Sequence, residues 1–150
     1  MSRIRLPVLS RRVRVAVVIA VVALLFVGSV MPVSAGSLPD VVPVLGDDAA
    51  ADEPGTGTEI PVFAVFHVIG YAVLAFALAY WQVESKRSRV LFYVGIFVVT
   101  VAYGAAIELI QGTIPYRQFS YWDMVLNAIG AALGLLSWAV LSRFVAFVDS

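Results

Sequence analysis

The sequence predicts an all-α, polytopic integral membrane protein: a four-transmembrane-helix bundle with its N- and C-termini in the cytoplasm. Composition is the first observation behind this prediction, since 61% of the 150 residues are hydrophobic and only 13% are charged. Soluble domains contain roughly 45–50% apolar residues. The second observation is that the apolar residues come in blocks long enough to cross a bilayer. A chain of this length forms a single domain.

The first apolar block, residues 15–33, follows a basic tail over residues 1–14 that carries five arginines. The block just crosses a hydrocarbon core of ~30 Å at ~1.5 Å per residue. A second interpretation stays open, because a basic start, an apolar run and Val33-Ser34-Ala35 are typical of a cleavable signal peptide. The apolar run exceeds the ~7–15 residues of a signal core. An uncleaved transmembrane helix is therefore the favoured interpretation.

Residues 34–59 form an acidic linker rich in Gly and Pro, without sustained periodicity. Such a composition buries little apolar surface, so we expect a solvated external spacer. Residues 60–144 form the membrane domain, with helices at about 61–82, 90–111 and 122–140. Pro61 suits the first position of a helix. Gly112 and Pro115 end the helix before them.

The placement of lysine and arginine predicts the orientation in the membrane. The tail has five basic residues and the turn at 83–89 has three, whereas the linker has none and the turn at 112–121 has only Arg117. We therefore expect a multi-pass protein of the cell membrane, with the linker and the 112–121 turn outside. The few basic residues beyond the tail argue against a nucleic-acid partner. The absence of cysteine excludes disulfides and thiolate metal sites.

In this orientation, polar residues of three spans fall at one depth, near the outer surface of the membrane. Ionisable residues inside apolar spans are costly, so they indicate a functional site. The predicted polar pocket contains His67, Tyr71, Glu108, Gln111, Arg117, Asp123 and Asn127. Helical spacing places these residues on stripes that continue into small residues for helix packing, at Gly104, Gly130 and Gly134. We expect a tightly packed hairpin over Tyr103–Gly134 that carries an outward-facing pocket.

Each polar residue also has a purely structural interpretation. Glu108 can neutralise Arg117, and Asp123 can stabilise the positive end of a helix dipole. Asn127 and Gln111 can be interhelical hydrogen-bond partners, and His67 can be a hydrogen-bonded packing residue. A metal held by His67, Glu108 and Asp123 is chemically conceivable. The chain has one histidine, however, and the spacings are unlinked, so we expect no metal and no cofactor.

Several of these elements match a known family pattern. They are Glu108-Leu109-Ile110-Gln111, Pro115-Tyr116-Arg117, Asp123 with Asn127 and Gly130, and His67 with Tyr71. Over roughly residues 60–140 the chain resembles the VanZ-like membrane proteins. Phe63 and Ala64 stand where that family often has an Asp-Lys pair before the histidine. The resemblance implies a small polytopic protein of a family named for a teicoplanin-resistance member. No reaction, cofactor or catalytic residue is carried over with it.

Three functions remain open, in this order. The first is a non-enzymatic envelope protein, connected with antibiotic resistance or envelope modulation. It binds an anionic or glycosylated lipid headgroup or a lipophilic glycopeptide, with Arg117 available for phosphate or carboxylate. The second is a small proton-coupled transporter, which needs a homo-oligomer to form a pore. The third is an enzyme acting on a lipid-linked substrate, with Glu108 or His67 as general base. No nucleophile elbow, His-Glu-x-x-His or phosphate-binding Gly-Lys motif is present.

Overall fold

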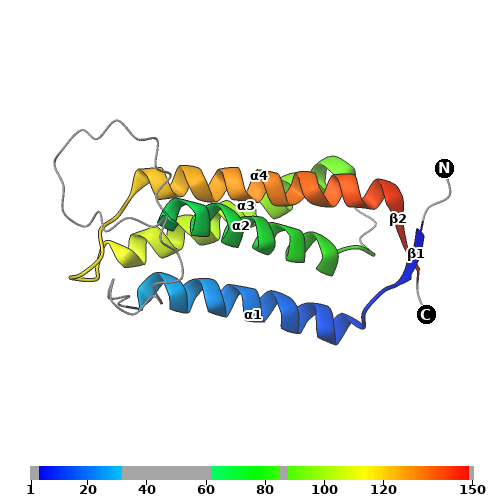
Figure 1. Cartoon of the computed structure of the whole chain (residues 1–150), viewed down its shortest axis with the longest axis horizontal. Coiled ribbons are helices and arrows are strands. Elements are labelled where there is room, and N and C mark those ends of the chain that lie inside the picture. The colour runs from blue at the N-terminus through cyan, green and yellow to red at the C-terminus, as the bar shows by residue number, and fades with distance from the viewer. Residues whose placement is uncertain (1–3, 32–61, 85–87, 149–150) are drawn as a thin grey trace.

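The computed structural model describes residues 4–31, 62–84 and 88–148. The elements follow in the order β1 (Ile4–Pro7), α1 (Arg11–Val30), α2 (Val62–Trp81), α3 (Arg89–Gln111), α4 (Tyr121–Phe144) and β2 (Val145–Val148). Among the described residues, four helices are long and apolar enough to cross a membrane. They lie side by side along the long axis (Figure 1). The prediction of an all-α, multi-pass membrane protein is confirmed. The expected linker at 34–59 and the signal-cleavage position lie outside the described residues.

Serine residues begin three of the helices and explain where these helices start. Ser10 accepts a hydrogen bond from the backbone N–H of Val13 at 3.4 Å, so α1 begins at Arg11, four residues before the expected start at 15. Ser88 accepts from Leu91 at 3.3 Å. Each serine satisfies one of the backbone donors that a helix N-terminus leaves unpaired. The expected basic tail of residues 1–14 is therefore helical in its last four residues.

Helix α4 packs most extensively on α2. Gly130 faces the carbonyl of Val68, and Gly134 faces the backbone of Ala72, so closely that an added Cβ would collide at either position. These glycines let the two helix backbones approach each other. The sequence predicted close packing at these glycines without naming the partner helix, and the structure shows that the partner is α2.

The two ends of the bundle differ, and we name them by what they hold. The hairpin end holds the turn of residues 112–120 between α3 and α4, and the terminal end holds β1 and β2 (Figure 1). At the terminal end the two strands pair in parallel, from Ile4 opposite Val145 to Pro7 opposite Val148. Trp138 stacks on Phe147 with ring centroids 5.5 Å apart. This small sheet joins the two ends of the chain and was not expected from the sequence.

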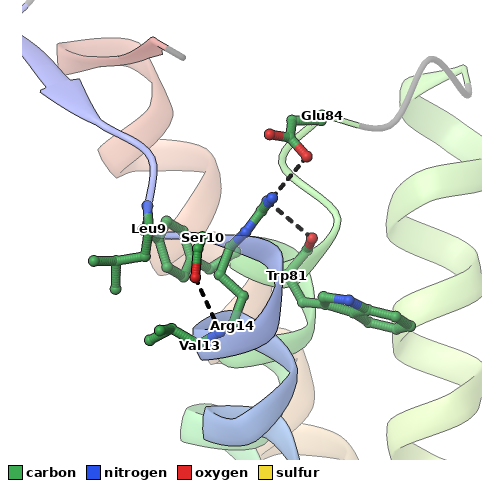
Figure 2. Close-up of polar contacts among 7 residues, drawn as sticks. Leu9, Ser10, Val13, Arg14, Trp81 and Glu84 are labelled. Carbon is green, nitrogen blue, oxygen red and sulfur yellow. Dashed lines mark hydrogen bonds and ion pairs between the residues drawn. The ribbon is translucent and has the colours of Figure 1, made fainter. Parts of the chain in front are cut away.

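Arg14 also lies at the terminal end, between α1 and the end of α2 (Figure 2). Its side chain is buried, with Nη1 donating to the carbonyl of Trp81 at 3.1 Å and Nη2 donating to Glu84 Oε2 at 2.6 Å. A cation here pairs with the negative end of the α2 dipole. Arg14 was expected in a cytoplasmic tail, but it links the first two helices.

Candidate functional site

Three ionisable side chains from three helices meet at the hairpin end. His67 comes from α2, Glu108 from the last turn of α3 and Asp123 from the first turn of α4. Each offers one metal-ligating atom, and these atoms all lie within 4.8 Å of one another. The three residues, separated by up to 56 positions in the sequence, therefore form one group, which we call the His–Glu–Asp cluster.

Glu108 is the buried member of the cluster, with 1% of its surface exposed. Its Oε2 accepts a hydrogen bond from the backbone N–H of Ser120 at 3.2 Å. Ser120 in turn caps α4, because its hydroxyl accepts from the backbone N–H of Asp123 at 3.1 Å. The second oxygen, Oε1, has no hydrogen-bond partner among the described residues. Buried polar atoms are usually paired, so this oxygen is available for a ligand.

Asp123 and His67 form the open side of the cluster. Asp123 Oδ1 lies 3.4 Å from His67 Nδ1, and their side chains are 29% and 20% exposed. Within the described chain His67 Nδ1 makes no aligned hydrogen bond, so its contact with Asp123 is electrostatic. The position of Asp123 in the first turn of α4 also favours a negative charge, because the N-terminal end of the helix dipole is positive. The cluster is thus closed at Glu108 and accessible at the other two residues.

Asn127 and Tyr71 lie next to the cluster in the bundle interior, where they are 1% and 2% exposed. Both pack against Gly104 of α3, where an added Cβ would lie 2.8 Å from Asn127 Nδ2 and 3.0 Å from Tyr71 Cε1. Gly104 therefore provides the space that the amide occupies. Neither Asn127 Nδ2 nor Oδ1 has a hydrogen-bond partner in the described part of the chain. The interhelical hydrogen bond expected of Asn127 is absent there.

The other two residues of the predicted pocket hold the end of α1. Gln111 Nε2 donates to the carbonyl of Ser29 at 2.8 Å, and Arg117 Nη2 donates to the carbonyl of Met31 at 2.8 Å. Tyr116 Oη donates to the carbonyl of Val30 at 3.0 Å. The last carbonyls of a helix have no donor within it, so these side chains cap α1. Among the described residues, Arg117 forms no ion pair with Glu108, so the structural Glu108–Arg117 pair that the sequence left open is not observed.

This geometry lies within a region that matches a protein family. Residues 14–142 match the VanZ/LLP1 family. The chain belongs to the VanZ/LLP1 family. The match begins in α1, so in this VanZ/LLP1 protein the family region includes the first span as well as residues 60–140, where the motifs lie. No curated protein and no solved structure matches the chain.

Sequence reasoning missed two residues that shape this VanZ/LLP1 site. Ser120 both caps α4 and binds Glu108, and the pattern Ser120-x-x-Asp123 is a helix-start signal that could have identified it. Tyr103 donates its hydroxyl to the carbonyl of Val22 in α1 at 2.7 Å. That bond leaves no signal in the sequence, because its acceptor is a backbone group that any residue provides.

Proposed function

We propose that this VanZ/LLP1 protein is a non-enzymatic component of the cell envelope that binds a polar headgroup at the hairpin end. The ligand is a membrane lipid or a lipophilic compound of the glycopeptide type. One observation carries the proposal: side chains from three spans converge there, and one oxygen of the buried Glu108 has no hydrogen-bond partner among the described residues. Ionisable groups inside membrane spans are retained mainly for function.

The chemistry of the cluster favours one class of headgroup. Glu108 Oε1 and the carboxylate of Asp123 are hydrogen-bond acceptors, so they suit hydroxyl or ammonium groups. Arg117, the residue expected to bind a phosphate or carboxylate, donates to Met31 and supports α1. A glycosylated headgroup, which is rich in hydroxyl groups, is therefore a better fit than an anionic one.

The bundle interior supports binding over proton-coupled transport. Beyond Asn127 and Tyr71, which adjoin the cluster, the buried polar side chains of the described residues toward the terminal end are Thr100 and Arg14. Thr100 donates to the carbonyl of Ile96 in its own helix at 2.8 Å, and Arg14 bonds to Trp81 and Glu84. A proton pathway needs a chain of ionisable groups through the membrane. The polar chemistry is concentrated at one end instead.

We infer that the hairpin end faces outward and that both termini are cytoplasmic. Three basic residues in the 83–89 turn against one in the 112–121 turn support this orientation. The chain lacks cysteine, so single cysteines can report it. A membrane-impermeant maleimide should label Gln118→Cys in intact cells and Val148→Cys only after lysis. Labelling in the opposite order would contradict the orientation.

Mass spectrometry of lipids that co-purify with the protein tests the proposed function. Glu108→Gln keeps an acceptor for Ser120 but removes the charge, so retention of glycosylated species should fall at least about tenfold. Arg117→Gln is the matched control and should retain them. Equal lipid profiles in the wild type and Glu108→Gln would contradict the proposal, as would a loss confined to Arg117→Gln.

A further inference from the structure

The donor set and dimensions of the His–Glu–Asp cluster are those of a metal site. We propose that His67, Glu108 and Asp123 bind one divalent transition-metal ion at the hairpin end. The sequence argued against this, because the three residues are unlinked in spacing. Packing of α2, α3 and α4 brings their ligating atoms within 4.8 Å of one another.

The distance between two of the ligands already suits a bound ion. His67 Nδ1 and Asp123 Oδ1 are 3.4 Å apart. Two ligands at ~2.0–2.1 Å from a tetrahedral zinc ion are separated by roughly 3.4 Å. Glu108 completes the set within 4.8 Å, a separation that rotation of one carboxylate group can close. The three ligating atoms are therefore close enough for one ion to be shared by the three helices.

The state of Glu108 is a second, independent observation that points to a cation. Its side chain is 1% exposed, and its Oε1 has no partner in the described part of the chain. The nearby cation, Arg117, donates to Met31 and forms no ion pair with either carboxylate among the described residues. Two carboxylates held this close together in the bundle repel each other when both are ionised. A divalent ion compensates both of them and occupies the unpaired oxygen.

The ligand types indicate which ions suit the site. One imidazole nitrogen and two carboxylates favour zinc, manganese or ferrous iron over copper(I), which prefers thiolates. Three protein ligands leave at least one coordination position open. The partial exposure of His67 and Asp123 places that opening on the accessible side of the cluster. An oxygen of a headgroup could complete the coordination there. That last step rests on the proposed function, whereas metal binding itself does not.

Titration of the full-length protein in detergent, after chelator treatment and without added lipid, tests the metal site. Zinc and manganese are the probes, followed by calorimetry, and cobalt is a spectroscopic substitute for zinc. We expect one equivalent per chain, with at least about a tenfold loss of affinity in each of Glu108→Gln, Asp123→Asn and His67→Gln. Glu84→Gln, a carboxylate variant at the terminal end, should bind like the wild type.

The outcomes separate the two proposals. Absence of saturable binding in the wild type, or equal affinity in Glu108→Gln and Asp123→Asn, would overturn the metal site. Thermal melting of the metal-free variants shows whether they are folded. If His67→Gln does not fold, Asp123→Asn tests the metal site in its place. If metal binding fails while Glu108 still governs lipid retention, only the metal proposal fails. If metal binds and no headgroup is retained, only the proposed function fails.

Discussion

Buried polar side chains occur at both ends of the bundle, and their partners differ. At the terminal end, both terminal nitrogens of Arg14 are bonded, to the carbonyl of Trp81 and to the carboxylate of Glu84, and only its Nε lacks a partner among the described residues. At the hairpin end, Glu108 has one oxygen bonded to Ser120 and the other without a partner in the described chain, and the amide of Asn127 has none. A paired buried group stabilises the fold, whereas an unpaired one costs about 1–3 kcal/mol.

The same contrast exists within the hairpin end itself. Gln111 and Arg117 are bonded to the last carbonyls of α1, only a few residues from Glu108. The residue types alone do not distinguish the two groups, since all are polar and lie at one depth. Their partners do: Gln111 and Arg117 hold the end of α1, whereas the His–Glu–Asp cluster is the part of the hairpin end that we propose binds a ligand.

The largest loss of stability should come from a substitution in the contact between α2 and α4. In Gly134→Ala the added Cβ would collide with the backbone of Ala72, so unfolding free energy should fall by about 3 kcal/mol. Gly95→Ala is the matched control, because nothing lies within 4 Å of its added Cβ. It should be neutral or stabilise the helix by up to about 1 kcal/mol. Melting in detergent measures both, and equal losses would contradict the packing described.

Loss of the Arg14 side chain at the terminal end should cause the next largest loss of stability. Arg14→Met removes the donor to the carbonyl of Trp81 and one donor to the carboxylate of Glu84, and should cost about 2 kcal/mol. We expect this loss to be modest because Glu84 is half exposed to solvent, where water screens its ion pair with Arg14. Arg11→Met, at an exposed position of the same helix, is the control and should change little. Lipid retention should be unaffected in the folded variant. If Arg14→Met were as stable as the wild type but no longer retained lipid, the ligand site would not be confined to the hairpin end.

A smaller loss of stability is expected when a contact between the hairpin end and α1 is removed. Gln111→Leu removes the donor to the carbonyl of Ser29 and should cost about 1 kcal/mol. The exposed Gln118→Leu is the matched control and should melt like the wild type. Proteolysis can show whether α1 has loosened from the bundle. A Gln111→Leu variant of wild-type stability that loses its ligand would place Gln111 in the binding site.

The sequence carried enough information for the helices and for the shared depth of the polar residues. Apolar blocks of spanning length predicted α1 to α4, and helical spacing predicted that Glu108 and Asn127 face the bundle, where both are buried. The convergence of Glu108 and Asp123 with His67 followed from depth and face together. The family match over residues 14–142 agrees with the resemblance drawn from these motifs.

The sequence did not predict which groups contact each other, because helical periodicity gives the face of a residue and not its partner. Spacing gave the face on which Gly130 and Gly134 lie but not the helix they meet, which is α2. The acceptors of Arg117 and Gln111 are backbone carbonyls, which every residue has. The short strands β1 and β2 pair residues from opposite ends of the chain, and four-residue apolar segments give no pairing signal. The expectation of no metal rested on the single histidine and the unlinked spacings, and it stays a prediction.

Thermal melting of metal-free Glu108→Gln beside the wild type is the most direct test of the central claim that Glu108 serves a ligand. Glutamine keeps an acceptor for the backbone N–H of Ser120 and cannot ionise, so it removes any repulsion between Glu108 and the nearby Asp123. Functional sites commonly sacrifice stability for binding. The melting temperature should therefore be unchanged or raised. A fall as large as that of Arg14→Met would show that Glu108 stabilises the fold, and would contradict this account.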